Sequence, residues 1–325
     1  MPPSAPKVCV FGTGAVGATY AYILWRAGIP AQSITCICRS NYSAAAASGF
    51  TIDSELWGAN LRFHPNVVRS ISVAASHGPF DYNGIAIEPP YARAHPANPL
   101  LSTVVHLSVS SVAPALISHY ARLEHLHIGT YPADAPAPHN AAAVQLAELL
   151  RRGGASATVH DDVQGARWAK VVVNGAWNSL CALTRSRSGD LLASSPRAAD
   201  HVRSVMREIA AVARASGYSH VDEQFVESQM ERAKAMGLPG AQPSMLEDAL
   251  AGRAMEVDAI VGHVLEIARE KAVATPQLEA VYVLLRALDQ SFKADRARQS
   301  DSRANGQTEK GDKERQRGEE IDIDK

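Results

Sequence analysis

The sequence predicts two domains, a first one in which strands and helices alternate and a second one built of helices alone. At 325 residues the chain exceeds the size of one ordinary domain. Near its start, a short β-type run leads through a glycine-rich turn into a helical segment, an order typical of an α/β unit. From Val163 onward, apolar residues recur with the period of a helix. We expect the domains to span residues 7–162 and 163–291, followed by a charged, disordered tail over 292–325.

Composition excludes several classes of function. The formal net charge is −1, so the chain lacks the basic surplus that nucleic acids and anionic membranes attract. The four cysteines form no C-x-x-C pair and no metal-ligand spacing, which is typical of reduced core residues. No apolar run is long enough to span a bilayer, and the N-terminus lacks the order of a signal peptide. We therefore expect a cytoplasmic protein with no nucleic-acid or membrane partner.

The glycine-rich turn carries the first functional signal. The strand from Lys7 to Phe11 is followed by G-T-G-A-V-G, and a helix begins directly after it. In this context G-x-G-x-x-G is the fingerprint of a Rossmann-type dinucleotide-binding unit. Gly12 permits the tight turn, Gly14 lets the backbone approach a pyrophosphate, and Gly17 lets the helix pack closely on the strand. We expect the cofactor to contact Gly12, Thr13, Gly14, Ala15, Val16 and Gly17.

The end of the second strand indicates which dinucleotide is bound. The run from Ser33 to Cys38 ends in Arg39-Ser40-Asn41, where an NAD-binding unit would place an acidic residue for the ribose 2′-OH. An arginine there suits a 2′-phosphate, because its planar fork binds phosphate bidentately. The sequence favours NADP(H) over NAD(H).

The remainder of the first domain is regular except at one junction. We expect a hairpin from residues 49–52 and 61–63, a strand after Asn98, two weaker strands over 116–120 and 123–128, and a helix over 140–150. His125 and His127 share a strand face, but no third ligand stands at a recognisable spacing, so we predict no metal site. At the junction, Asp81-Tyr82 leads directly into Asn83-Gly84. A parallel crossover needs a dozen or more residues, so the sheet is expected to be short of two strands.

The helix from Arg167 to Thr184 is the centre of the second half. Lys170, Asn174 and Asn178 recur at i, i+4 and i+8 and therefore lie on one face. The other positions are apolar nearly all round, which predicts a buried helix that carries an ammonium and two carboxamides into an interior or a cleft. A lysine snorkelling from a domain interface would give the same pattern.

Further helices complete the second half. Ser244 followed by Glu247 predicts a capping box at a helix start. Glu256 is expected within a long helix whose apolar stripe begins at Val257, and a last helix is expected over 276–288.

These motifs together resemble the ketopantoate reductases, or 2-dehydropantoate 2-reductases, over most of residues 7–290. The resemblance is carried by G-T-G-A-V-G, N-G-I-A-I-E from Asn83, N-P-L-L-S-T-V-V from Asn98, W-A-K-x-x-x-N-x-x-x-N from Trp168, and S-M-L-E-D…E-V-D from Ser244. It implies an all-α second domain similar to the C-terminal domain of 6-phosphogluconate dehydrogenases. It also implies reduction of 2-dehydropantoate by NADPH in pantothenate and coenzyme A biosynthesis, and it leaves a homodimer open.

The resemblance assigns roles to individual residues. Lys170 would be the general acid, Asn174 and Asn178 would bind substrate, and Ser244 would bond the substrate carboxylate region. In addition, Glu256 would lie by the cofactor ribose and Lys170, and Asn83 would contact both cofactor and substrate. The chemistry agrees, because hydride addition to a ketone leaves an alkoxide that a protonated lysine stabilises and protonates.

The junction at Tyr82 departs from the family pattern, which has a strand ending in Lys-Ala, a helix and another strand there. A mis-joined exon and a real deletion would both produce it. Two alternatives therefore stay open beside the 2-dehydropantoate reductase: a related enzyme acting on another 2-keto acid, and an NADP-binding protein inactivated by the missing segment.

Overall fold

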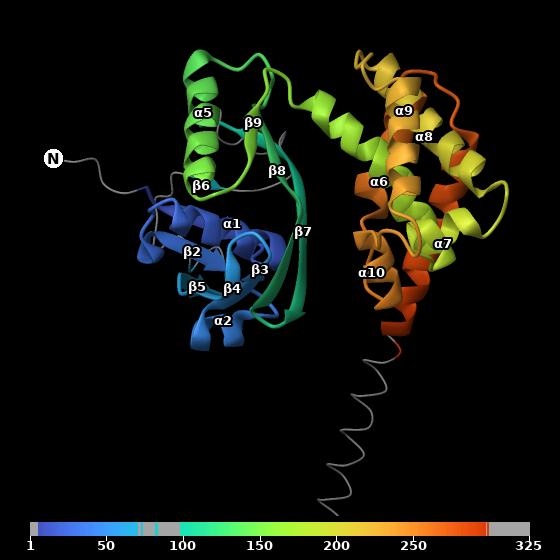
Figure 1. The fold of residues 1–325 in the computed structure, drawn as a ribbon. Coiled ribbons are helices and arrows are strands. Elements are labelled where there is room, and N and C mark those ends of the chain that lie inside the picture. The colour runs from blue at the N-terminus through green and yellow to red at the C-terminus, as the bar shows by residue number, and fades with distance from the viewer. Residues whose placement is uncertain (1–5, 71–72, 74–81, 84–97, 297, 299–325) are drawn as a thin grey trace, which may run out of the picture. The chain divides into compact units, whose positions relative to one another are not determined.

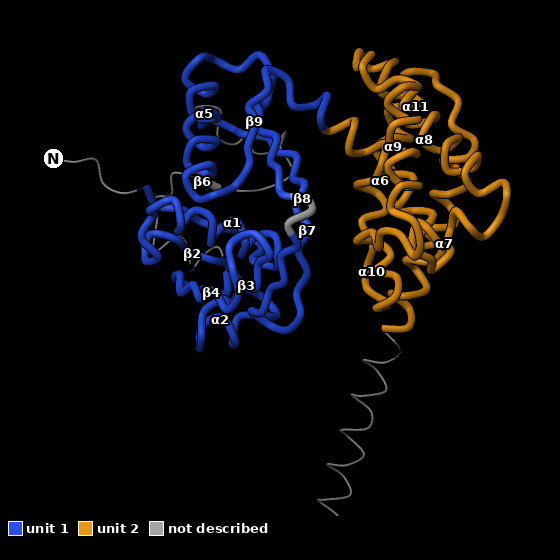
Figure 2. Tube along the Cα trace, in the orientation of Figure 1, with its two compact units in different colours: residues 1–166 blue, residues 167–325 orange. Residues whose placement is uncertain are grey.

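The computed structural model describes residues 6–70, 73, 82–83, 98–296 and 298. The chain divides into two compact units, residues 1–166 and 167–325 (Figure 2). Helix α6 (Gln164–Thr184) crosses this boundary in its first turn. The first unit combines strands with helices and the second is helical, as the sequence predicts (Figure 1). Among the described residues, no helix is long and apolar enough to cross a membrane.

The described part of the first unit contains two sheets. In the first sheet the strand order is β5-β2-β1-β6, with all neighbours parallel. In the second, the order is β4-β3-β8-β7, and β9 also pairs with β8. The strands are β1 (Val8–Phe11), β2 (Ile34–Ile37), β3 (Phe50–Ser54), β4 (Gly58–Phe63), β5 (Asn66–Val68), β6 (Tyr82–Asn83), β7 (Leu101–Ala113), β8 (Leu116–Thr130) and β9 (Ala157–Val159).

Helix α1 joins the two sheets into one core. It contacts β1 and β2 of the first sheet and β7 and β8 of the second. The core between them includes the fully buried side chains of Ile23, Phe50 and Phe63. Helix α1 spans Ala15–Arg26. The other helices in the described part of this unit are η1 (Ala31–Ser33), α2 (Tyr42–Ser48) and α5 (Ala137–Arg152).

The junction at Tyr82 lies at the edge of the first sheet as described. The backbone of β6 pairs in parallel with β1, Tyr82 opposite Val8 and Asn83 opposite Cys9. A parallel strand therefore flanks β1 at the point where the sequence raised doubt about the sheet. Residues 84–97 lie outside the described residues, so the prediction of two missing strands stays a prediction.

One strand prediction is wrong. The two weaker strands expected over 116–120 and 123–128 are one continuous strand, β8, paired along its length with β7. The pairing passes from Leu107 opposite Glu124 to Ser108 opposite Tyr120, so the intervening residues of β8 are absorbed as a bulge. Pairing with the long strand β7 thus stabilises, as one strand, two segments whose sequences each predict only a weak strand.

The helical unit is built around α8 (Ala198–Ala215), whose apolar stripe from Val202 to Ala213 is fully buried. Its contacts include α7, α9 and α11. Gly175 lets α6 approach α8 closely, because a Cβ there would lie 2.5 Å from Ile209 Cδ1. The other helices are α7 (Ser188–Ala193), α9 (Glu223–Ala235), α10 (Ser244–Leu250), the π-helical turn η2 (Asp258–Gly262), α11 (His263–Glu270) and a last helix over 276–296.

Two boundaries differ from those expected. Glu256 precedes the helix that it was predicted to join, and that helix opens with a π-helical turn. The last helix runs to residue 296, so a tail beginning at residue 292 is wrong for its first residues. The helix continues because Phe292 packs on the core and buried Asp289 bonds both Met255 N–H (2.9 Å) and the Lys293 ammonium (2.6 Å). Residues 299–325 lie outside the described residues.

Glu208 supplies a test of how the last helix is anchored. Its carboxylate, on α8, accepts the backbone N–H groups of Gln277 (3.1 Å) and Leu278 (2.8 Å). We expect Glu208→Gln to lower the free energy of unfolding by about 1–3 kcal/mol, since charge-assisted bonds to two N–H groups weaken. Urea unfolding followed by circular dichroism measures this, with Glu231→Gln, from a surface pair with Lys234, as the control. Equal losses in the two variants would contradict the anchoring role.

Candidate functional site

The glycine-rich loop has the geometry of a dinucleotide cradle. Gly12 has φ +80°, which favours glycine, and Gly14 precedes the first residue of α1. A Cβ on Gly17 would lie 2.5 Å from the backbone oxygen of Gly12 and 3.4 Å from Val10 of β1, so only glycine allows this close packing. A Cβ on Gly14 would meet nothing within 4 Å. The space over Gly14 is thus open for a diphosphate at the start of α1.

Side chains fix this loop to the end of β2. Thr13 is buried, and its hydroxyl donates to the Ile37 carbonyl (2.7 Å). Asn41 donates from Nδ2 to the Thr13 carbonyl (2.6 Å). The loop and the segment after β2 therefore form one rigid corner. Sequence reasoning treated Asn41 only as a small polar neighbour, because a contact across 28 residues of chain leaves no local signal.

A pocket of about 460 Å³ opens at this corner. Arg39 lines it, whereas Ala15 and Val16 are the first residues of α1 but are not among the lining residues. None of the described residues that line it is Asp or Glu. It is formed by Gly12, Thr13, Gly14, Ile37, Arg39, Ser40, Asn41, Ser111, Ala113, Pro114, Ala115 and Ile117. The residues present fit a dinucleotide that carries extra negative charge.

In the helical unit, α6 presents Lys170 in a half-buried position. Burial lowers the pKa of the Lys170 ammonium below 10.5, the Glu256 carboxylate raises it, and the Arg167 guanidinium lowers it again. Glu256 itself is exposed. The resemblance also predicts an interaction between Lys170 and Glu256. It only partly opposes the effect of burial, so the ammonium remains easier to deprotonate than that of a solvated lysine.

The two asparagines predicted to bind substrate differ in their exposure to solvent. Asn174 is partly exposed, while Asn178 is 3% exposed and its Oδ1 accepts the Met245 N–H at 3.4 Å. The capping box is wrong: Ser244 is the first residue of α10, and no side chain of the preceding Pro243 caps the helix. Asn178 instead accepts a hydrogen bond from an N–H group at the start of the helix. A residue of α6 therefore positions α10 and its exposed Ser244.

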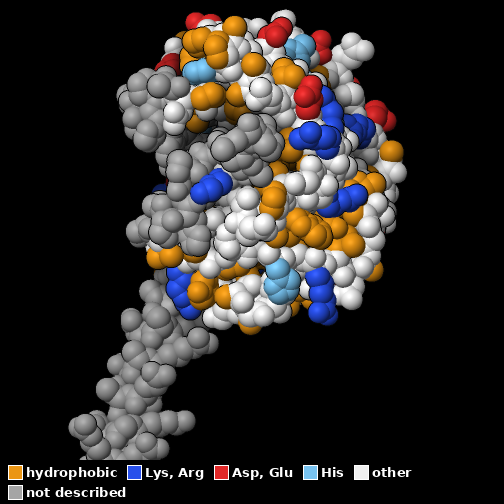
Figure 3. Space-filling view, turned by 90° about the vertical axis from the view of Figure 1, so that its left-hand side faces the viewer, with side chains coloured by type: hydrophobic (Ala, Val, Ile, Leu, Met, Phe, Trp, Pro, Cys, Tyr) orange, Lys and Arg blue, Asp and Glu red, His pale blue; other side chains and the backbone are white. Residues whose placement is uncertain are grey.

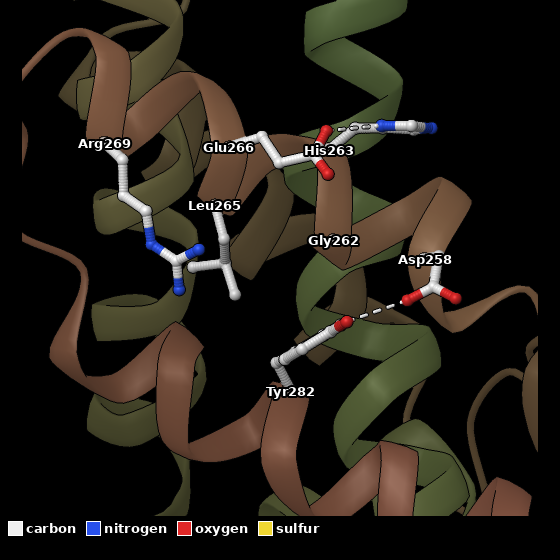
Figure 4. Close-up of a pocket in the computed structure, with 7 residues that line it drawn as sticks. All are labelled: Asp258, Gly262, His263, Leu265, Glu266, Arg269 and Tyr282. Atoms are coloured by element: carbon white, nitrogen blue, oxygen red, sulfur yellow. Dashed lines mark hydrogen bonds and ion pairs between the residues drawn. The ribbon is translucent and has the colours of Figure 1, made fainter.

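A small hollow of about 100 Å³ lies elsewhere in the helical unit, on α11 (Figure 4). Four of its polar groups are paired with one another: the Tyr282 hydroxyl donates to Asp258 (2.8 Å), and His263 bonds Glu266 (3.0 Å). None of the predicted substrate or catalytic residues lines it. Its size and internal pairing leave little room for a substrate. Asn83 belongs to β6, and its side chain lies outside what the structure describes.

Four histidines meet on the second sheet. His106 faces His125 across the β7–β8 pair, and His127 Nδ1 lies 2.8 Å from His160 Nε2. Sequence reasoning recognised only His125 and His127, because the other two come from β7 and from the residue after β9. Among the described residues, no group of three or more His, Cys, Asp or Glu has the arrangement of a metal site. Burial, then the neighbouring imidazoles, lower the pKa of His127 to about 4.

A Rossmann-type unit with an intact fingerprint loop, followed by a helical unit, defines a two-domain protein of the dinucleotide-binding class. Residues 162–289 match the family described as ketopantoate reductase PanE/ApbA, C terminal. A solved structure of 2-dehydropantoate 2-reductase from Methylococcus capsulatus is 28% identical, with a TM-score of 0.70, over 88% of this chain and 97% of that one. The second unit therefore matches the C-terminal family of ketopantoate reductases, and the chain shares the fold of a 2-dehydropantoate 2-reductase.

Two further comparisons define the range of the likeness. A 2-dehydropantoate 2-reductase of Mesorhizobium japonicum is 31% identical over 58% of this chain, and the match spans only 55% of that relative's length. A ternary structure of D-mandelate dehydrogenase with NADH and anilino(oxo)acetate has a TM-score of 0.71 over 88% of this chain and 99% of that one. Its identity is 17%, so it shows a shared fold alone.

The two helix-proximal glycines form a matched pair of variants. Gly17→Ala places a methyl group 2.5 Å from a backbone oxygen, so we expect a lower melting temperature and loss of dinucleotide binding. Gly14→Ala meets no protein atom, so the melting temperature should hold while the affinity for NADPH falls at least tenfold. Thermal unfolding and calorimetric titration of NADPH separate the two effects. A Gly14→Ala protein that binds NADPH normally would contradict the cradle.

The histidine cluster predicts acid sensitivity. His127 has a folded pKa of about 4, below its ordinary 6.5, so the unfolded chain takes up the proton first as the pH falls. Its contribution to stability should be complete above pH 6.5 and should diminish as the pH falls from 6.5 towards 4. Melting temperatures over this range measure the effect, and His127→Gln should flatten the dependence. An NMR titration of His127 near its ordinary pKa would contradict this account.

Proposed function

We propose that the chain is an NADPH-dependent reductase that converts 2-dehydropantoate to pantoate. The observation that carries the proposal is the half-buried ammonium of Lys170, held on α6 beside the carboxylate of Glu256. Such a group suits proton donation to a nascent alkoxide. The family and its members named 2-dehydropantoate 2-reductases support the same reaction.

NADPH is the proposed cofactor rather than NADH. Supporting it are Arg39 at the corner pocket and the lack of an acidic side chain among the lining residues. A carboxylate would bind the ribose 2′-OH of NAD and repel a 2′-phosphate. The NADH-bound D-mandelate dehydrogenase shares the fold with this chain, but that likeness carries no evidence on the cofactor.

Each residue has a defined role in the proposed mechanism. The dinucleotide, when bound, supplies a hydride for the C2 ketone, with its diphosphate held by the backbone of Gly12–Gly17. Lys170 stabilises the negative charge that develops on the ketone oxygen and donates its Nζ proton to it. Asn174 and Ser244 orient the 2-keto acid, and Asn178 positions α10 through Met245. Glu256 favours the protonated form of Lys170, because its carboxylate raises the pKa that burial lowers.

The substrate and its close relatives differ in the group attached to the 2-keto acid. Pocket contacts set discrimination between 2-keto acids, so a related 2-keto acid is the alternative substrate, and a substrate panel separates the two. A cytoplasmic location and a homodimer remain predictions. An inactive NADP-binding protein would bind NADPH yet reduce no member of the panel, although Lys170 is present.

The pH dependence of reduction tests the roles of Lys170 and Glu256. The value of kcat/KM for 2-dehydropantoate should fall as the pH rises through the Lys170 pKa, which lies below 10.5. Lys170→Ala should lower it about 10²–10⁴-fold. Glu256→Gln should move the alkaline limb to lower pH, since it removes the carboxylate that raises this pKa. A limb that stays in place in Glu256→Gln would contradict the pairing, and a normal rate in Lys170→Ala would contradict the proposed function.

A further inference from the structure

Glu256 lies in a stretch that regular secondary structure does not hold in place. Residues 253–256 belong neither to α10 nor to the helical run that begins at Val257. Met255 and Val257 are buried, at 8% and 1% exposed, while Glu256 between them is exposed. The two buried side chains tie the backbone to the core and leave the carboxylate of Glu256 outside it. The position of this carboxylate therefore depends on what anchors the backbone on either side.

Asp289, on the last helix, anchors the backbone just before Glu256. Its Oδ1 accepts the N–H group of Met255 at 2.9 Å. Asp and Glu side chains usually lie at the surface, as on the face of the molecule in Figure 3, whereas Asp289 is 1% exposed. Burial raises the pKa of Asp289, but the bonds from Lys293 and from the Met255 N–H outweigh burial and bring it below its ordinary value. A buried, ionised carboxylate thus holds the residue next to Glu256.

The same face of the last helix anchors the backbone after Glu256. The Tyr282 hydroxyl and Arg286 Nη1 both donate to the Asp258 carboxylate, each at 2.8 Å (Figure 4 shows the Tyr282 bond). Tyr282, Arg286 and Asp289 are spaced i, i+4 and i+7, so they lie on one side of the helix. The ion pair between Arg286 and Asp258 is 36% and 60% exposed and therefore stabilises little. The buried Asp289 is the stronger of the two anchors.

Glu256 is the route by which Asp289 affects Lys170. Burial lowers the pKa of Lys170. Within the described part of the chain, the charges that then act on it are Glu256, which raises this pKa, and Arg167, which lowers it. Asp289 contributes to this balance only through the position of Glu256. A shift of the Met255 backbone would move the next residue, Glu256, and leave the effect of burial on Lys170 less opposed.

We propose that Asp289 is a positioning residue for the reduction, which through the Met255 N–H holds the Glu256 carboxylate beside the ammonium of Lys170. This inference rests on the proposed function, because it takes from that function the role of Lys170 as proton donor. The contact joins residues 34 apart in the chain, so no local pattern in the sequence indicates it.

The experiment is an NMR titration of isotopically labelled lysine side chains in the full chain, with the Lys170 signal assigned from Lys170→Arg. It follows the ammonium directly and needs no turnover. Asp289→Ala removes the acceptor of the Met255 N–H, so the pKa of Lys170 should fall, in the direction given by Glu256→Gln. The double variant should shift no further than Glu256→Gln alone, because both changes act through one carboxylate. The alkaline limb of kcat/KM for 2-dehydropantoate should move the same way.

Further variants separate positioning from loss of stability. Asp289→Asn removes the charge but keeps an oxygen that can accept the Met255 N–H, so the Lys170 titration should stay as in the unaltered chain. Glu208→Gln loosens the other end of the same helix and should lower the melting temperature without moving that titration. If Asp289→Ala does not fold, Asp289→Ser takes its place, since its hydroxyl is too short to reach the Met255 N–H.

The outcomes separate failure of this inference from failure of the proposed function. An unchanged Lys170 pKa in Asp289→Ala, beside a fall in Glu256→Gln, would overturn the inference and leave the pairing of Lys170 with Glu256 intact. A fall of the same size in Glu208→Gln or in Asp289→Asn would also overturn it, since neither variant removes the acceptor. If the titrations behave as expected but the chain reduces no 2-keto acid, the positioning of Glu256 stands and the proposed function fails.

Discussion

The helical unit depends on one constraint. It must keep the ammonium group of Lys170 half-buried on a helix that is otherwise mostly apolar. Burial alone would favour the neutral amine of Lys170, and the Glu256 carboxylate opposes that tendency. Holding Lys170 there requires α6 to be packed firmly, which the close approach of Gly175 to Ile209 provides. Asn178 extends the same constraint to α10, because its carboxamide satisfies an N–H group at the start of that helix.

In the first unit, the constraint is that the backbone of the glycine-rich loop must stay open to an anion. Gly17 brings α1 against β1, and Thr13 and Asn41 fix the loop to the end of β2. These bonds position the loop and the segment at Arg39 as one corner, so the diphosphate and ribose subsites are set by the same few contacts. Preorganisation of this kind limits the conformational entropy that binding would otherwise lose.

Sequence alone predicted the parts of this structure that local patterns encode. The fingerprint loop, the β3–β4 hairpin and the row of Lys170, Asn174 and Asn178 on one helix are examples, because glycine spacing and apolar period act over a few residues. The contacts it missed join distant segments. The four-histidine cluster requires strand pairing to be known, and the capping box at Ser244 failed because a residue of another helix bonds the helix start.

The central claim is that the corner at Gly14 and Arg39 forms a working NADPH site even though a segment is predicted to be missing at Tyr82. Thermal unfolding of the full chain with and without NADPH, with NADH as comparison, tests it most directly. A ligand at about 100 times its Kd stabilises the folded state by roughly 2.7 kcal/mol. The account predicts a clear rise in melting temperature with NADPH and a smaller rise with NADH. No rise with NADPH, or a larger one with NADH, would contradict it.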